Sequence, residues 1–354
     1  MERSMHPHYP KIFSPIRLGP VKIRNRFYAS PQSMPLNIGG KPTDDYVHYN
    51  AARAEGGCGL IFVSMASSTR GRTIQPSAHS AAHVPAFRVL ADAVHERNSK
   101  IFAEPYYHWS TAGSWQALSP SAPPLGPSNA QFMSRELRAA SRAMNQQTIS
   151  HLTEALCQST RHLRQAGFDG IMLHAAHGAM FEQFLSPYFN RRTDEYGGSL
   201  TNRMRILMDS LEQVRESAGS EMAVGMRFNC DELLNGGYGS PEASEILARI
   251  AGSGLIDFVD LDVAVEPEQF WLGMPSVFVE PHPYRPYVEA VRAAAGDVPV
   301  LSVFGRLNSV ADAEAMIGSG ICDMVGAARA LIAEPDLVRN AYEGREERSR
   351  RCIA

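Results

Sequence analysis

Short apolar runs alternate with amphipathic stretches along the 354 residues of the chain, and this alternation restricts the fold more than any other feature of the sequence. The runs have the length of buried strands and are predicted at residues 26–29, 60–64, 101–105, 170–174, 223–228, 257–262, 298–304 and 323–327. The stretches have the length of helices and are predicted at residues 43–55, 85–97, 150–165, 200–218, 241–251, 286–295, 309–318 and 331–342. Each predicted strand is therefore followed by one predicted helix.

This pattern predicts an α/β fold, a single (β/α)8 TIM barrel. The strands are almost continuously apolar, as parallel strands are when they are buried on both faces. A doubly wound sheet is the alternative, but eight units without a nucleotide-binding fingerprint fit it poorly. Ahead of the first strand, residues 12–25 alternate polar and apolar side chains around Leu18-Gly19-Pro20, which predicts an N-terminal hairpin lid.

Composition narrows the class of partner. A net charge of −3 with 20% charged residues offers no basic surface for nucleic acid or a membrane, so a small-molecule substrate is expected. No apolar run approaches the ~20 residues that span a bilayer, and the first residues lack the apolar core of a signal peptide. The five cysteines are scattered and form no disulfide framework, which predicts a cytoplasmic protein.

Two histidines follow the predicted strand at 170–174. His174 ends the run, and His177 comes three positions later, ahead of a polar segment at 192–199. Polar residues just past the carboxyl end of a buried strand are where an α/β enzyme keeps its chemistry. We therefore expect the histidines at the substrate end of an active site. The alternative is one histidine in the core and one on the surface.

The last two predicted strands end in glycine and arginine. Gly305 and Arg306 close the first of them, and Gly326, Ala327 and Arg329 close the second. In a (β/α)8 barrel the loops after the seventh and eighth strands commonly hold a phosphate group. The alternative is that the glycines serve tight turns and the arginines lie on the rim.

Arg227 and Glu104 also end predicted strands. A guanidinium buried in a barrel needs a partner, because an unpaired interior charge is costly. The N1/C2 carbonyl edge of a flavin would be such a partner for Arg227, and Glu104 could accept a hydrogen bond from the pyrimidine N–H of the flavin. A plain ion pair between Glu104 and Arg227 is the alternative.

Several motifs in order along the chain resemble one family. They are Arg24-Asn25-Arg26, Gly56-Gly57-Cys58-Gly59-Leu60-Ile61, His174-Ala175-Ala176-His177-Gly178, Gln183-Phe184-Leu185-Ser186-Pro187, residues 192–203 and residues 326–329. Together they resemble the old yellow enzyme (NADH:flavin oxidoreductase) family, and more narrowly its trimethylamine dehydrogenase / 2,4-dienoyl-CoA reductase branch. The resemblance covers essentially the whole chain.

The resemblance implies an FMN-binding barrel. By motif position, the FMN contacts would come from Ser30, Pro31, Gln32, Ser33, Ala66, Glu104, Arg227, Gly305, Arg306, Gly326, Ala327 and Arg329. Ser33 stands where trimethylamine dehydrogenase has the cysteine that links its flavin, so the FMN here would be non-covalent. Glu104 is similar to the glutamate of the amine dehydrogenases in this branch, where many other members carry glutamine.

The resemblance also implies a reaction. In the ene-reductases of the family two such histidines hold the oxygen of an α,β-unsaturated carbonyl, which assigns His174 and His177 as catalytic and predicts NAD(P)H-dependent reduction of an activated C=C bond. The predicted substrate pocket comprises Met65, Tyr106, Tyr107, His108, Ala179 and Trp271. Ala179 stands where those reductases have a proton-donating tyrosine, so the proton would come from water or from Tyr106, Tyr107 or His108.

Oxidative dehydrogenation or N-demethylation of a methylated amine or betaine is the alternative reaction, because it needs no proton donor to carbon. A methylated cation is recognised by a cage of aromatic rings. The loops predicted to border the mouth carry aromatic residues that could build one: Tyr106, Trp109, Trp115, Phe270, Trp271 and Tyr284.

The end of the chain carries a further prediction. Residues 1–345 would form the FMN barrel, and residues 346–354 would begin a truncated segment that leads into an iron–sulfur region. Cys352 matches the first ligand of a 4Fe–4S cluster, which needs several cysteines at close spacing, so a cluster is expected only in a longer protein. That protein would add an FAD/NAD(P)H module as electron partner. Direct reduction by NAD(P)H is the alternative, and assembly into a homo-oligomer is left open.

Overall fold

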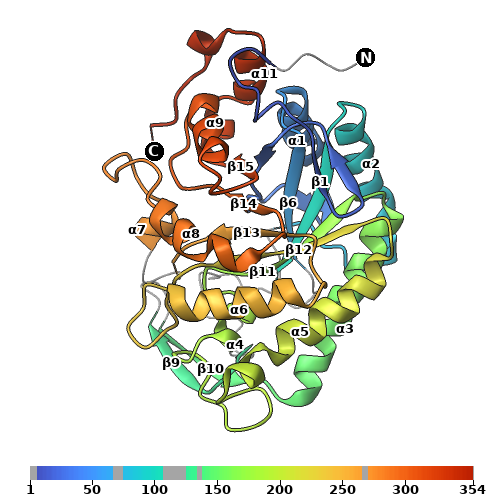
Figure 1. Ribbon diagram of the computed structural model, residues 1–354. Helices are drawn as coiled ribbons and strands as arrows, with labels where there is room; N and C mark the ends of the chain where they lie inside the picture. Colours follow the sequence, from blue (N-terminus) through green and yellow to red (C-terminus); the bar gives the residue numbers. More distant parts are fainter. Residues whose placement is uncertain (1–5, 67–74, 107–124, 134–137, 265–269, 354) are drawn as a thin grey trace.

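Eight parallel strands close into a barrel in the computed structural model, which describes residues 6–66, 75–106, 125–133, 138–264 and 270–353 (Figure 1). The order around the barrel is β11-β12-β13-β14-β15-β3-β6-β7. The strands are β3 (Phe27–Ala29), β6 (Leu60–Ala66), β7 (Lys100–Tyr106), β11 (Gly170–Ala175), β12 (Ala223–Asn229), β13 (Phe258–Asp262), β14 (Val300–Ser302) and β15 (Met324–Ala327). Each overlaps one predicted strand, so the predicted TIM barrel is confirmed.

Helices surround the barrel, and α3, α5 and α6 cross the face seen in Figure 1. The long helices are α1 (Asp44–Glu55), α2 (Val84–His95), α3 (Gln146–Gln165), α5 (Leu200–Ala218), α6 (Ser240–Gly252), α8 (Arg285–Arg292) and α9 (Val310–Gly318). Side-chain caps begin four of them, because a side-chain oxygen accepts an otherwise unpaired backbone N–H of the first turn. These capping residues are Thr43, Asn145, Ser199 and Ser309.

The last predicted helix differs from the structure. Instead of one helix over 331–342, the chain forms α10 (Arg329–Ala333) and α11 (Leu337–Tyr342). Pro335 lies between them, and proline has no N–H to donate to the helix and its ring clashes with the preceding turn. The predicted helix at 286–295 likewise ends as a 3₁₀ turn, η2 (Ala293–Ala295).

Short elements within the loops were not predicted. They are β4 (Asn37–Ile38), β5 (Lys41–Pro42), β8 (Leu125–Gly126), β9 (Ala130–Met133), β10 (Arg138–Ala143), α4 (Met180–Leu185), α7 (Phe270–Gly273), η1 (Ala81–His83) and η3 (Glu346–Arg348). Of these, α4 matters most for function, because it begins directly after the histidine segment.

The predicted N-terminal hairpin is present as β1 (Ile16–Leu18) and β2 (Val21–Ile23), paired antiparallel. Its apolar side chains join one buried cluster with the residues that fill the barrel, among them Phe102 and Phe258. Gly19 at its turn lies against Asp257, directly before β13. The hairpin therefore covers the amino ends of the strands and leaves the carboxyl ends to the site.

Aromatic rings fill the barrel below the site. The ring of Phe62 lies 5.5 Å from that of Phe102 and 5.9 Å from that of Phe258. Glycine at position 225 leaves room for this packing, since a Cβ there would lie 2.5 Å from the ring of Phe258. The interior is thus a packed core rather than a pore.

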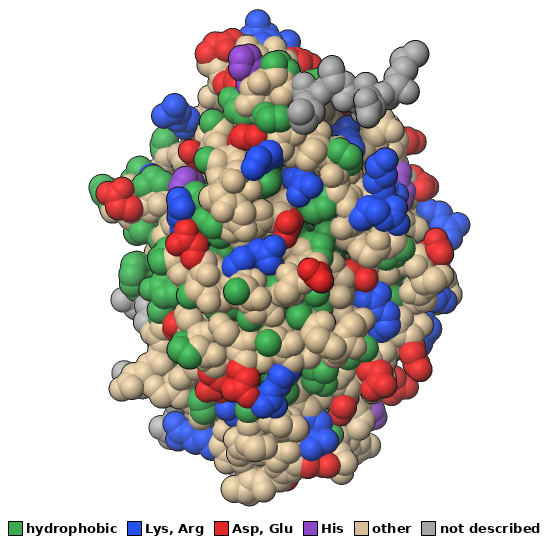
Figure 2. Space-filling view, in the orientation of Figure 1, with side chains coloured by type: hydrophobic (Ala, Val, Ile, Leu, Met, Phe, Trp, Pro, Cys, Tyr) green, Lys and Arg blue, Asp and Glu red, His purple; other side chains and the backbone are tan. Residues whose placement is uncertain are grey.

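The surface in Figure 2 shows basic and acidic side chains interspersed, with no large area of one sign on the face in view. The first described residues pack against the end of the chain, where the hydroxyl of Tyr9 donates to Glu346 at 2.7 Å. Among the helices that the structure describes, none has both the length and the apolar character to cross a bilayer.

Candidate functional site

Register brings polar side chains of three neighbouring strands into one row. His174 on β11 pairs with Arg227 on β12, and Arg227 pairs with Asp260 on β13. Residues paired in this way point to the same face of a sheet. The row lies at the carboxyl end of the barrel, above the aromatic layer.

Arg227 is the centre of a buried ion network. Its guanidinium lies 2.7 Å from Asp260 and 3.4 Å from Glu104 on β7, and it donates to the hydroxyl of Ser30 at 3.3 Å. The hydroxyl of Tyr28 donates to Asp260 at 2.8 Å. Asp260 is therefore the nearest partner of Arg227 in this structure. It adds to the two partners that the sequence predicted for Arg227, the flavin edge and Glu104.

The pKa values in this network follow from opposing charges in a buried place. Burial alone would raise the pKa of Glu104, but the charges of Arg227 and His174 outweigh it and hold this pKa at about 2. Burial would lower the pKa of Arg227, but the three carboxylates around it raise it above its ordinary value. The pKa of Asp260 is raised by burial, which Arg227 offsets only in part.

Each histidine of the pair faces its own carboxylate. Nδ1 of His174 lies 3.0 Å from Oε1 of Glu104, and Nε2 of His177 lies 3.2 Å from Oδ2 of Asp262. The two ring centroids are 5.4 Å apart, and the side chains expose only 13% and 21% of their surface. Burial would raise the pKa of Asp262, but the neighbouring His177 lowers it below its ordinary value.

This arrangement fixes the ring orientations. A carboxylate that accepts from one ring nitrogen decides which nitrogen carries the hydrogen and stabilises a positive charge on the ring. An imidazolium is a donor at both nitrogens. A ring held by a carboxylate at one nitrogen can therefore donate to a substrate from the other.

Asp260 and Asp262 are residues of this site that the sequence interpretation missed. Asp262 ends the predicted strand at 257–262 and Asp260 lies two residues before it, and a charged residue near a strand end is the signal that singled out Arg227 and Glu104. The same criterion, applied to every predicted strand, identifies both aspartates. The pairing of Asp262 with His177 depends on the fold, because Asp262 ends β13 and His177 follows β11.

The predicted FMN contacts after β3 and β6 lie close to this network. Ser30 and Gln32 line a small hollow between β3 and α1, and Pro31 between them is half-buried. Ser33 is exposed and accepts from the amide of Gln75 at 2.5 Å. Ala66, like Met65 of the predicted substrate pocket, is fully buried at the end of β6.

The predicted phosphate residues lie after β14 and at the end of β15. Gly305 and Arg306 have φ values of +67° and +54°, and the guanidinium of Arg306 donates to the carbonyl of Val279. Ala327 ends β15, and Arg329 beyond it is half-buried. Within the described part of the chain, the side chain of Arg329 forms no ion pair.

Protein packing accounts for the two glycines. At Gly305 a Cβ would lie 3.0 to 3.1 Å from the rings of Pro275 and Pro283. At Gly326 it would lie 2.3 Å from the ring of Tyr28. Their role in close approach to a phosphate stays a prediction, because a second reason for glycine exists at each position.

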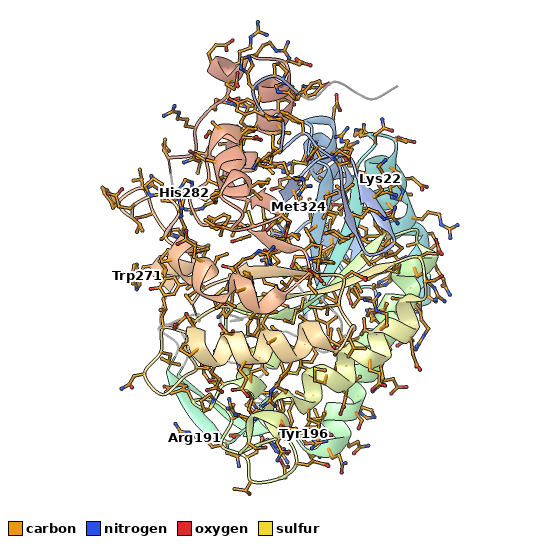
Figure 3. All side chains as sticks on the ribbon, in the orientation of Figure 1. Lys22, Arg191, Tyr196, Trp271, His282 and Met324 are labelled. Atoms are coloured by element: carbon orange, nitrogen blue, oxygen red, sulfur yellow. The ribbon has the colours of Figure 1, made fainter. Side chains whose placement is uncertain are left out.

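Only some of the other predicted substrate-pocket residues lie in the described part of the chain. Ala179 precedes α4 and is 7% exposed, and Trp271 on α7 lies at the flank of the molecule and is 59% exposed (Figure 3). Tyr106 ends β7, but its side chain is outside the described residues, as are Tyr107 and His108 altogether. Trp109 and Trp115 of the alternative aromatic cage lie there too.

Comparison with known proteins identifies the family. The model of the NADH:flavin oxidoreductase / NADH oxidase family matches residues 11–348. The chain is 31% identical to NADH oxidase of Thermoanaerobacter brockii, over 98% of this chain and 53% of the relative. It is 29% identical to the multifunctional alkene reductase/demethylase OYE of Caballeronia cordobensis, over 97% of this chain and 50% of the relative.

A solved structure gives the same result. Histamine dehydrogenase from Rhizobium sp. 4-9 superimposes with a TM-score of 0.85 at 29% identity, covering 97% of this chain and 49% of that protein. The chain thus spans about half the length of the relatives it matches. It belongs to the NADH:flavin oxidoreductase / NADH oxidase family, in the branch of long proteins whose barrel portion it matches.

Proposed function

We propose that the barrel binds non-covalent FMN at the carboxyl ends of its strands. The side chains present fit such a ligand: Ser30 and Gln32 border the hollow beside β3, and Arg227 lies next to Ser30. Arg329 adds a half-buried guanidinium that has no acidic partner in the described part of the chain. Bound there, FMN would supply hydride transfer at its N5 atom.

We propose further that the reaction is reduction of an α,β-unsaturated carbonyl compound. The observation that carries it is the pair of histidine rings, 5.4 Å apart and each held by a buried carboxylate. His174 and His177 would donate to the carbonyl oxygen and stabilise the negative charge that develops on it. A hydride then adds to the β-carbon and a proton to the α-carbon, so that the C=C bond becomes a single bond.

The source of that proton is a separate proposal. Ala179 carries no proton donor, and its small side chain leaves room for a wide substrate. Water, or one of Tyr106, Tyr107 and His108, would supply the proton to the α-carbon.

Oxidation of a methylated amine is the second candidate. The observation that favours it is the excess of acidic groups: Glu104, Asp260 and Asp262 surround the single guanidinium of Arg227. When both histidines are neutral, this network carries net negative charge and attracts a cationic amine. The alkene reductase/demethylase relative bears both activities in its name.

The electron donor would be NAD(P)H, directly or through a reductase module. Because the chain matches about half of its relatives, we propose that a longer protein carries an FAD/NAD(P)H module and a 4Fe–4S cluster. Cys352, which is half-buried, would be a cluster ligand there.

Titration with a phenol tests the carbonyl-binding role. Under this proposal, p-hydroxybenzaldehyde added to the yellow oxidised protein gives a long-wavelength charge-transfer band, since the phenolate oxygen takes the place of the substrate oxygen. A protein that shows no band, and whose flavin is bleached anaerobically by a methylated amine, would support the second candidate instead. A protein that cannot take up FMN at all would contradict both.

The double change His174→Ala with His177→Ala tests the residues themselves. We expect kcat/KM for an enone to fall by at least about a hundredfold, because two donors to the developing charge are lost. His151→Ala, an exposed histidine on α3, serves as the matched control and leaves the rate unchanged. Undiminished enone reduction in the double variant would mean that the assigned role is wrong.

A further inference from the structure

Two non-glycine residues at the His177–Asp262 pair have a left-handed backbone. His177 itself has a φ of +56°, and Ala264, two residues after Asp262, has a φ of +81°. Such a conformation costs roughly 1 kcal/mol or more for a residue with a Cβ, and it persists only where surrounding contacts enforce it. Something in the structure must therefore hold both segments in place.

One buried carboxylate is linked to both segments. Glu182 in the first turn of α4 is fully buried, and its carboxylate accepts from the backbone N–H of Gly178, next to His177. It also accepts from the side-chain amide of Asn229 at the end of β12. The same amide of Asn229 donates to the carbonyl of Ala264 at 2.7 Å. We call this chain of contacts, from Gly178 through Glu182 and Asn229 to Ala264, the Glu182 clamp.

Among the described residues, Glu182 is an acidic group buried without a cation beside it. In the described part of the chain no lysine or arginine forms an ion pair with Glu182, and Glu232 and Asp262 lie near it. Burial, together with the charge of Glu232, raises the pKa of Glu182 well above its ordinary value. Burying an acidic group without a cation is unfavourable, and the hydrogen bonds from Gly178 and Asn229 offset that cost only in part.

We propose that Glu182 is a positioning residue for the histidine pair. Through the clamp it fixes the segment that carries His177 relative to the segment that carries Asp262, and so sets the 3.2 Å contact between the two side chains. The importance of that contact for the reaction rests on the function proposed above. Glu182 itself is fully buried, so its effect on the reaction would come through His177.

Two variants of Glu182 test the proposal. Glu182→Ala removes both links. Glu182→Gln keeps one oxygen for an N–H donor but turns its NH₂ group toward the other donor, so it breaks one link and keeps the volume. Glu232→Gln is the matched control: this carboxyl is also buried, but it accepts from Ser186 and from the N–H of Tyr238 and lies outside the clamp.

The first measurement needs no activity and no substrate. In protein labelled with ¹⁵N-histidine, the ring signals of His177 are assigned by their loss in His177→Ala. We expect Glu182→Ala to shift them strongly, because the ring loses its fixed contact with Asp262, and Glu182→Gln to shift them less. Glu232→Gln leaves them in place even where it lowers the melting temperature.

The second measurement reports on the site. We expect the Kd for p-hydroxybenzaldehyde to rise on the order of tenfold or more in Glu182→Ala, since small misplacements of binding groups have effects of this size. The flavin content stays that of the unchanged protein, and Glu232→Gln binds the phenol within about twofold of it.

The outcomes separate the two proposals. If the unchanged protein binds no phenol, the proposed reaction fails, and the His177 signals alone decide about the clamp. If Glu182→Ala keeps both the His177 signals and the phenol affinity, the clamp is overturned. Should Glu182→Ala not fold, the same readouts on Glu182→Gln decide, and unchanged His177 signals there overturn it.

Discussion

At the scale of single residues, Arg227 supports the whole polar layer of the barrel. Asp260 and Glu104 lie 2.7 and 3.4 Å from it, and Asp262 lies at 4.0 Å. All four side chains are buried. Without the guanidinium, the carboxylates would remain buried with no strong counter-charge, which is the costly way to break an ion network.

Arg227→Met, which keeps most of the volume, is therefore expected to lower the free energy of unfolding by about 3–5 kcal/mol in urea denaturation. Arg249→Met provides the control, because Arg249 is 45% exposed and pairs with Glu245 on the surface of α6. Its loss should change the free energy of unfolding by no more than about 1 kcal/mol. Equal effects of the two changes would show that the buried network is not a main source of stability.

At the scale of elements, the closure of the barrel depends on close contact between β15 and β3. Gly326 pairs with Tyr28 in the register of these strands. The ring of Tyr28 occupies the space that a side chain at 326 would need, with its nearest atoms 2.3 Å from the position of a Cβ. Tyr28 cannot easily move aside, because its hydroxyl donates to Asp260 and its ring packs against Phe62.

Gly326→Ala should accordingly destabilise the protein by about 1–3 kcal/mol through overpacking, as measured by the midpoint and slope of urea unfolding. The matched change Gly252→Ala, at the end of α6 with open space around the added Cβ, is expected to be neutral or stabilising by up to about 1 kcal/mol. A stable Gly326→Ala protein would mean that β3 and β15 can shift apart, contrary to the packing described here.

At the scale of the whole molecule, buried carboxyl groups make stability depend on pH. Burial raises the pKa of Glu232 to about 8, and the hydrogen bonds from Ser186 and Tyr238 offset this only in part. The folded protein then keeps a proton that the unfolded chain has released above a pH of about 4.5. The free energy of unfolding contributed by this group therefore falls as the pH rises from about 4.5 to 8.

Glu232→Gln removes this titration. We expect the melting temperature of the unchanged protein to fall more between pH 5 and pH 8 than that of the variant, which differential scanning calorimetry at both pH values measures. Two curves of equal slope would mean that Glu232 ionises in the folded protein much as it does in the unfolded chain.

The sequence by itself determined the barrel and the end of it that carries the site. Parallel barrel strands are buried on both faces, so they appear as apolar runs wherever they occur, and all eight were visible. The residues at the ends of those runs, such as His174, Arg227 and Glu104, could be named for the same reason. Pro335 also signals the end of a helix in the sequence, but the apolar periodicity on both sides of it favoured one continuous helix over 331–342.

Only the tertiary structure decided which of these groups bind each other. Arg227 meets Ser30 across 197 positions of sequence, and His177 pairs with Asp262 from another strand end. Such pairings depend on strand order, on register and on the path of loops, none of which leaves a local signal in the sequence. The same holds for Glu182, whose burial follows from the packing of the short helix α4 against β11 and α5 rather than from any periodicity.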